Sequence, residues 1–379
     1  MLIAIPAETD PAEGRVAATP ETVKKLVGLG AEVRVQSGAG LQSGIPDQDY
    51  VAQGAAIAAS TAAAVQDADI VLRVRRPSAA DIAGVKPGAA VIAIMDPHGH
   101  IDALQSLAAA GVSAFAMELM PRITRAQTMD VLSSQANIAG YRAVIEAAAE
   151  YGRVIPMMMT AAGMIQPAKI FVMGVGVAGL QAIATARKLA AIVTATDVRP
   201  ATKEQVVSLG AKFIAVEDEE FKQAETAAGY AKEMSADYKA KQAALTASHI
   251  ASQDIVITTA LIPGRPAPVL VTAAMVESMR PGSVIVDLAV ERGGNCELAK
   301  PGETIVSKNG VKIVGPLNLA GRLPATASAL YAKNLLAFIE TLIDPKTKSL
   351  AIKWDDELVK ATLLTKDGAL AHPGFQSGG

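Results

Sequence analysis

Three glycines near the middle of the chain have the spacing of a turn that binds a dinucleotide. They form a G-x-G-x-x-G pattern directly after an apolar run. The first glycine of such a turn allows the sharp bend from strand to helix, the second lets the backbone approach a pyrophosphate, and the third allows close helix packing. The following helix would present free N–H groups and its positive dipole end to the phosphates. The residues expected at the pyrophosphate are Gly174, Gly176, Val177, Ala178 and Gly179.

An acidic residue stands where the adenosine ribose of a dinucleotide would be bound. A second apolar run ends at Asp197, 23 positions after Gly174. A carboxylate there would accept hydrogen bonds from the ribose hydroxyls and would repel a 2′-phosphate. The pattern therefore favours NAD(H) over NADP(H), although Arg199 weakens that preference; Val198 and Arg199 are expected beside the same ribose. The alternative is a flavodoxin-like βαβ unit whose glycines are incidental.

The composition excludes several classes of protein. The net charge is −2, and no basic stripe indicates a nucleic-acid partner. No apolar run reaches the roughly 18–20 residues that span a bilayer, and the first residues lack the features of a signal peptide. The single cysteine, Cys296, cannot form an internal disulfide, which fits a reducing cytoplasm. Cys296 could instead be a nucleophile, but no histidine motif stands near it, and no metal site is expected.

The elements that must position these residues alternate between strand and helix patterns. A helix is expected to begin at Pro20, with Thr19 as its N-cap, and to stop at Gly30. Such alternation predicts parallel sheets with helices on both faces. The strand-like runs are 2–5, 32–35, 70–74, 89–94, 113–116, 169–173, 192–197, 254–259, 283–288 and 312–314.

Two long helical patterns divide the chain of 379 residues into domains. They cover about 129–151 and 325–342. We predict an α/β protein with two Rossmann-like parallel-sheet domains flanking a cleft. The nucleotide domain (136–321) would be inserted in the other domain (1–135 plus 322–379). Ligands of such sheets bind beyond the carboxyl ends of the strands.

A polar, highly charged stretch at 217–242 differs from its surroundings. One interpretation is a solvated helical insertion. The other is a mobile loop that closes over a ligand, with Gly229 as its hinge and Tyr230 as its closing residue.

Four segments resemble a known family, the NAD(H)-binding domain I (alpha-1 subunit) of proton-translocating NAD(P)+ transhydrogenase in its split-subunit bacterial form. The resemblance covers essentially the whole chain. It is most specific at 117–135, 174–186, 258–264 and 287–295.

The resemblance implies several roles at the nicotinamide end of NAD(H). It places Arg122, Gln127 and Asp130 in a loop that holds the nicotinamide, where Gln127 can both donate to and accept from the carboxamide. Arg122 and Asp130 would orient Gln127 and each other; alternatively they are a surface ion pair at a helix start. The other implied contacts are Ser133 to the nicotinamide ribose, Tyr230 in the closing loop, apolar Ala260 and Leu261, and Asn295 beyond the next strand.

Alanine dehydrogenase shares the wider fold but differs at the residues for acid–base chemistry. That enzyme carries a catalytic lysine where this chain has Arg73, and arginine stays protonated. His98 lies near the position of its catalytic histidine, but in a Pro/Gly loop. Glu291 replaces its aspartate. Hydride transfer between two nicotinamide rings needs only proximity and orientation, so these losses fit a transhydrogenase.

The resemblance also implies partners. NADH on this chain would reduce NADP+ on a separate domain III, attached to a proton-conducting membrane domain II, with this chain as a homodimer on the cytoplasmic face of the membrane, not inserted in it. One alternative is an alanine dehydrogenase-like amino-acid dehydrogenase, with Arg73 as carboxylate anchor and His98 as acid–base. The other is a non-catalytic NAD(H) sensor that acts through 217–242.

Overall fold

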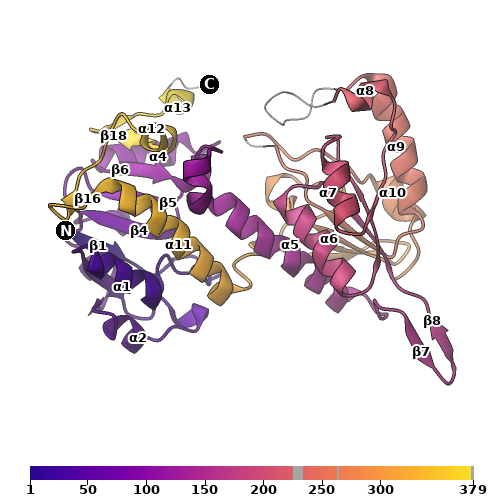
Figure 1. Cartoon of the computed structure of the whole chain (residues 1–379), viewed down its shortest axis with the longest axis horizontal. Helices are drawn as coiled ribbons and strands as arrows, with labels where there is room; N and C mark the ends of the chain where they lie inside the picture. The colour runs from indigo at the N-terminus through magenta and orange to yellow at the C-terminus, as the bar shows by residue number, and fades with distance from the viewer. Residues whose placement is uncertain (225–233, 263, 377–379) are drawn as a thin grey trace. The chain divides into compact units, whose positions relative to one another are not determined.

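The computed structural model describes residues 1–224, 234–262 and 264–376, which form two compact units (Figure 1). Unit 1 contains residues 1–135 and 320–379, and unit 2 contains residues 136–319. The chain thus leaves unit 1, builds unit 2 and returns.

Unit 1 is built on a six-stranded sheet in which every neighbouring pair is parallel. The spatial order is β3-β2-β1-β4-β5-β6, which is the doubly wound order with a switch point between the first and fourth strands. The strands are β1 (Leu2–Ile5), β2 (Glu32–Gln36), β3 (Ala56–Ala58), β4 (Ile70–Arg75), β5 (Ala90–Ile94) and β6 (Ser113–Ala116).

Local sequence signals set the first helix of unit 1, α1 (Pro20–Gly28). Thr19 is its N-cap within a capping box, and Pro20 occupies the first turn, as the sequence predicts. Gly30 follows with φ +89°, a left-handed conformation that suits glycine and ends the helix. The other helices of residues 1–135 are α2 (Asp47–Val51), α3 (Thr61–Val65) and α4 (Ile101–Ala109), with 3₁₀ turns η1 (Leu41–Ser43), η2 (Ala80–Ile82), η3 (Met117–Leu119) and η4 (Thr124–Met129).

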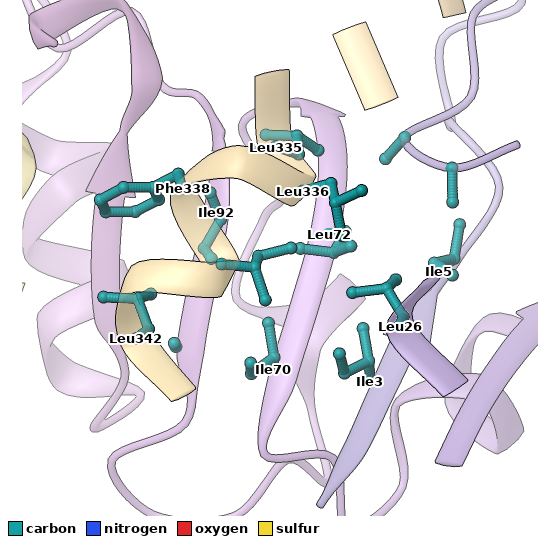
Figure 2. Packing of buried hydrophobic residues seen from close by; sticks show 14 of the residues in the cluster. Ile3, Ile5, Leu26, Ile70, Leu72, Ile92, Leu335, Leu336, Phe338 and Leu342 are labelled. Carbon is teal, nitrogen blue, oxygen red and sulfur yellow. The ribbon is translucent and has the colours of Figure 1, made fainter. Parts of the chain in front are cut away.

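The core of unit 1 includes a helix that arrives only after unit 2 in the chain. The helix α11 (Pro324–Leu342) lays Leu335, Phe338 and Leu342 against the sheet residues Leu72 and Ile92 (Figure 2). Beyond it, the chain forms two short antiparallel strand pairs and two short helices, which are β16 (Ile343–Asp344) with β17 (Ser349–Leu350), α12 (Glu357–Thr362), β18 (Thr365–Lys366) with β19 (Ala369–Leu370), and α13 (Pro373–Gln376).

Unit 2 has a seven-stranded sheet in the order β11-β10-β9-β12-β13-β15-β14. All pairs are parallel except the edge pair β14–β15, which is antiparallel and whose edge strand was not predicted. Two parallel sheets of Rossmann type confirm the predicted α/β class. The strands are β9 (Lys169–Met173), β10 (Ile192–Thr196), β11 (Lys212–Phe213), β12 (Ile255–Thr258), β13 (Val284–Asp287), β14 (Thr304–Val306) and β15 (Lys312–Val314).

The helices of unit 2 connect these parallel strands. The first, α5 (Val131–Glu150), begins in residues of unit 1 and continues into unit 2. Among the described residues, no helix is long and apolar enough to cross a membrane. The other helical elements are α6 (Val177–Lys188), α7 (Thr202–Ser208), α8 (Glu219–Lys222), α9 (Ala236–Ile250), α10 (Ala273–Ser278) and the 3₁₀ turn η5 (Val290–Arg292).

A two-stranded hairpin projects from unit 2 (Figure 1). Its strands are β7 (Met158–Thr160) and β8 (Gly163–Ile165), paired with Met159 opposite Met164. Every residue of both strands is exposed, although most are apolar. The hairpin was not predicted, because the apolar run broken by Pro156 and Gly163 has no regular strand alternation.

Candidate functional site

The glycine turn between β9 and α6 has a separate structural requirement at each glycine. Gly174 has φ +101°, and a Cβ atom there would lie 2.7 Å from the Thr259 hydroxyl oxygen. A Cβ atom on Gly179 would lie 1.9 Å from the Gly174 carbonyl oxygen. Gly176 differs, because a Cβ atom there would meet no described atom within 4 Å. The first and third glycines are therefore needed by the fold, and the second leaves open space for a ligand.

The start of α6 is free to receive an anion. Gly176 is the N-cap of α6, and no side chain of the described residues caps that end. The N–H groups of the first helical turn have no intrahelical partner, and the helix dipole favours negative charge at this point. Val177 is 38% exposed in this turn, so a pyrophosphate can reach the backbone. The turn thus fits a dinucleotide phosphate.

Asp197, directly after β10, lies beside the glycine turn. Its Oδ2 accepts a hydrogen bond from the backbone N–H of Val175 at 2.7 Å. The Arg199 guanidinium donates to both carboxylate oxygens, at 2.9 Å from Nε and 3.0 Å from Nη2, and the Arg199 backbone N–H donates as well. A carboxylate has about four acceptor positions. A ribose diol on Asp197 would therefore replace the guanidinium bonds.

A buried polar network holds the loop that follows β12. Asn295 is fully buried; its Oδ1 accepts from the Ala260 N–H, and its Nδ2 donates to the carbonyls of Ala260 and Pro268. The fully buried carboxylate of Asp287, at the end of β13, accepts from the Asn295 N–H at 2.7 Å and from the Thr258 hydroxyl at 3.0 Å. This network presents Leu261, which is 52% exposed, at the carboxyl end of the sheet.

Asp287 and Thr259 contribute to this region but were not predicted from the sequence. Asp287 follows the apolar run of its strand, as Asp197 follows that of β10. This similarity is the one feature of the sequence that could have predicted its role. Thr259 donates to the Gly174 carbonyl at 2.9 Å, and so joins the loop after β12 to the glycine turn. Both residues act on the shape of the site, and spacing alone does not reveal that.

In unit 1, seven residues of the loop 121–130 line a cavity of about 220 Å³, and Arg122, Gln127 and Asp130 are among them. Arg122 and Gln127 are exposed, and their side chains bond to no other described residue. Asp130 instead caps α5, because its carboxylate accepts from the backbone N–H of Ser133 at 2.9 Å and from its hydroxyl at 2.5 Å. The cavity therefore offers a free guanidinium and a free amide above a capped helix start.

The residues considered for acid–base or nucleophilic chemistry are buried or contact other residues of the protein. Arg73 is buried and paired with Glu8 at 3.4 Å. The exposed ring of His98 packs edge-on against Phe375. Cys296 is buried, and burial raises the pKa of its thiol to about 11, so it is a poor nucleophile. Glu291 accepts from the Asn318 backbone N–H.

Tyr230 and Gly229 lie outside the described residues, so the closing-loop interpretation stays a prediction. The flanking helices are described. Asp218 caps α8, Ser235 caps α9, and Glu220 accepts hydrogen bonds from Ser235. Among the described residues, no cluster of side chains could hold a metal ion.

A Rossmann sheet with a glycine turn after its first strand and an acid after its second strand defines a dinucleotide-binding domain. The chain is therefore a dinucleotide-binding α/β protein of two units.

The chain belongs to the alanine dehydrogenase/PNT family. Models of the N-terminal and C-terminal domains of that family match residues 4–139 and 143–373. The chain is 55% identical over 384 residues to the first portion of the NAD(P) transhydrogenase alpha subunit of Rhodospirillum rubrum, with all of both chains covered. It therefore belongs to the transhydrogenase alpha-subunit family, which confirms the resemblance inferred from its motifs.

Two solved structures are similar over nearly the whole chain. The transhydrogenase from Sinorhizobium meliloti matches with a TM-score of 0.89 and 61% identity, covering 98% of this chain and 100% of that one. An L-alanine dehydrogenase matches with a TM-score of 0.82 and 26% identity, covering 99% and 98%. The shared fold extends to both proteins, whereas the sequence is much more similar to the transhydrogenase.

Proposed function

We propose that the chain is the NAD(H)-binding alpha-1 component of a Re/Si-specific, proton-translocating NAD(P)+ transhydrogenase. In this role it binds NADH and presents it to NADP+ on a separate domain III, while membrane domain II couples transfer to proton movement. The observation that carries the proposal is the dinucleotide turn of Gly174, Gly176 and Gly179, which has open space at its second glycine. The membership of the transhydrogenase alpha-subunit family supports it.

The residues of unit 2 would bind the adenosine half of NADH. The N–H groups at the start of α6 would hold the pyrophosphate, with Val177 and Ala178 against it. Asp197 would bind the ribose hydroxyls and disfavour a 2′-phosphate, beside Val198 and Arg199. Ala260 and Leu261 would give apolar contacts from the loop that Asn295 holds.

The loop of unit 1 would hold the nicotinamide end. NADH supplies the hydride. Gln127 can donate to and accept from the carboxamide, and Arg122 adds a charged donor. Asp130 would fix the start of α5 and thereby Ser133, which would contact the ribose. Tyr230 would close the site and exclude water. Hydride transfer moves no proton at the reacting atoms, so orientation replaces acid–base chemistry. The ion pair of Arg73 with Glu8 supports this assignment over an amino-acid dehydrogenase in which Arg73 would bind the substrate carboxylate.

We also propose that the chain is a homodimer and is bound peripherally on the inner face of the membrane by its partner subunits. The hairpin β7–β8 supports the dimer. Met159 is 73% exposed and Met164 is 51% exposed, and an isolated two-stranded hairpin is marginally stable in water. Exposed apolar clusters of this kind mark protein contacts. Met159→Asp should then convert dimers to monomers in sedimentation, whereas Lys222→Asp, at an exposed side chain of α8, should not.

The decisive experiment follows NADH oxidation by absorbance, with and without an NADP(H)-binding transhydrogenase domain and NADP+. Rapid oxidation only with that domain present is the expected result. Saturable NADH binding without oxidation under any of these conditions would overturn the transhydrogenase role and favour a sensor. Reduction of NAD+ by L-alanine without a partner would indicate a dehydrogenase instead.

A further inference from the structure

The loop 121–130 is held by side chains that follow it by more than 200 residues in sequence. Arg125, on η4, makes a two-pronged bridge to Asp356, with Nη1–Oδ2 and Nη2–Oδ1 distances of 2.8 Å each. Its Nη2 also contacts Glu357 at 3.1 Å. Asp356 is the N-cap of α12, so the bridge ties the loop to a fixed helix start. Two-pronged arginine–carboxylate pairs fix orientation as well as distance.

The second anchor is Asn334 of α11. Its Nδ2 donates to the Thr128 carbonyl at 2.8 Å, and its Oδ1 accepts from the Ser134 hydroxyl at 2.7 Å. Asn334 is 8% exposed, and both of its bonds are part-buried. Thr128 directly follows Gln127, and Ser134 lies in the first turn of α5. One amide therefore joins the end of η4 to the start of the next helix.

We propose that Asn334 is a positioning residue for hydride transfer, with the Arg125–Asp356 bridge as a second anchor. This inference rests on the proposed role of Gln127. The Gln127 side chain makes no hydrogen bond to another described residue, so the η4 backbone sets the point from which its amide reaches the nicotinamide. A six-residue 3₁₀ helix has poor hydrogen-bond geometry and needs outside support. Asn334 provides that support one peptide away from Gln127.

The physical consequence is a separation of binding from chemistry. Most dinucleotide contacts proposed above lie in unit 2, whereas both hydrogen bonds of the Asn334 amide go to residues of unit 1. A loosened loop would leave NADH affinity nearly intact and misplace the nicotinamide. Misplacement by about 1 Å can slow a reaction by about 100-fold.

The test uses Asn334→Asp in the full chain, assayed with an NADP(H)-binding transhydrogenase domain. This change keeps an acceptor for Ser134 but removes the donor to Thr128. We expect the hydride-transfer rate to fall about 10- to 100-fold. The NADH dissociation constant should change by less than about twofold, or ~0.4 kcal/mol. Ser328→Ala is the matched control: Ser328 is buried on the same helix but bonds Val16 and Ser43.

Two further variants make each outcome decisive. In a Gln127→Ala background, Asn334→Asp should have little additional effect on the rate, because both changes remove the same orientation. Arg125→Gln, on the surface, should lower the rate severalfold without unfolding the chain, and Arg125→Lys should recover part of it. If Asn334→Asp does not fold, the rates of the variants Arg125→Gln and Arg125→Lys test the proposal.

The inference is overturned if Asn334→Asp lowers NADH affinity as much as rate, or if Ser328→Ala slows transfer equally. It is also overturned if Asn334→Asp and Arg125→Gln transfer hydride at the normal rate while Gln127→Ala does not; the proposed function then still stands. A normal rate in Gln127→Ala removes the proposed role of Gln127 itself.

Discussion

Asn295 and Ala260 form a reciprocal pair of hydrogen bonds across the carboxyl end of the unit 2 sheet. The Ala260 N–H donates to Asn295 Oδ1 at 2.9 Å, and Asn295 Nδ2 donates to the Ala260 carbonyl at 2.9 Å. The Asn295 backbone N–H in turn donates to Asp287. A side chain thus pairs with a loop much as a neighbouring strand would, which keeps the loop in place without a regular sheet partner.

Asn295→Asp should destabilise unit 2 and weaken NADH binding together. The carboxylate cannot donate to Ala260 or Pro268, and it adds a second buried charge near Asp287. We expect a loss of about 3 kcal/mol in the free energy of unfolding, measured with urea. Asn309→Asp is the control, because Asn309 also donates to backbone carbonyls in unit 2, but to those of Val276 and Met279 at the end of α10 and not to this loop. The control should lose stability but keep NADH affinity; equal weakening of NADH binding in both variants would contradict the assignment.

Alanine substitutions at Gly176 and Gly179 should affect different properties, NADH affinity at Gly176 and stability at Gly179. Gly176 has φ −80° and open space around a Cβ atom, so Gly176→Ala should unfold at the same urea concentration as the parent. It should still lose more than about tenfold, or ~1.4 kcal/mol, of NADH affinity, because the methyl group occupies the place of the pyrophosphate. In Gly179→Ala the methyl group collides with the Gly174 carbonyl, and about 1–3 kcal/mol of stability should be lost. Isothermal titration and urea unfolding separate the two; tight NADH binding by Gly176→Ala would contradict the phosphate site.

Asp197→Asn should reduce NADH affinity about 10- to 100-fold, because a hydrogen bond to a charged acceptor contributes about 1.5–3 kcal/mol. It should also narrow the difference between the affinity for NADH and the affinity for NADPH, since the repulsion of a 2′-phosphate is removed. Asp218→Asn is the control. It makes the same change of charge at the N-cap of α8, where asparagine also caps well. Equilibrium titration with both nucleotides measures the effect, and unchanged NADH affinity would place the ribose elsewhere.

His249 should make unit 2 less stable below neutral pH. Burial lowers the pKa of His249, which bonds the Thr194 hydroxyl at 2.9 Å, with Lys212 and Lys169 adding repulsion. The unfolded chain therefore takes up the proton first as the pH falls through about 6.5, and the folded state loses stability down to its own lower pKa. His249→Gln should show a smaller drop in urea midpoint between pH 7.5 and 5.5 than the parent. His100→Gln, an exposed histidine of unit 1, is the control; an identical drop in parent and His249→Gln would refute the prediction.

Local spacing made the dinucleotide turn and most strands predictable. Gly174, Gly176, Gly179 and Asp197 are close in sequence, and each has a requirement that one residue type meets. The helix at Pro20 was predictable for the same reason. The parallel strands are short apolar runs bounded by turns, which is the pattern of buried strands.

Contacts between distant segments were not predictable. The hydrogen bond of Asn334 to Thr128 joins positions 206 apart, and a single asparagine in a helix carries no sign of its partner. The pairing of Asp287 with Asn295 depends on a fold that places both at one sheet edge. The expected contact between Arg122 and Asp130, either to orient Gln127 and each other or as a surface ion pair, also depended on geometry: Asp130 bonds Ser133, and Arg122 is left exposed.

The position of α11 in the chain has a consequence for synthesis on the ribosome. The sheet strands of unit 1 emerge by residue 116, but the helix that covers them ends at residue 342. At about 5–20 residues per second, the intervening translation takes roughly 11 to 45 s. Ile70, Leu72 and Ile92 cannot be fully covered during that interval. All of unit 2 is translated in the same interval, before α11 is made. The domain whose strands are made first is therefore completed last, and its nascent apolar sheet is the part of the chain most in need of chaperone protection.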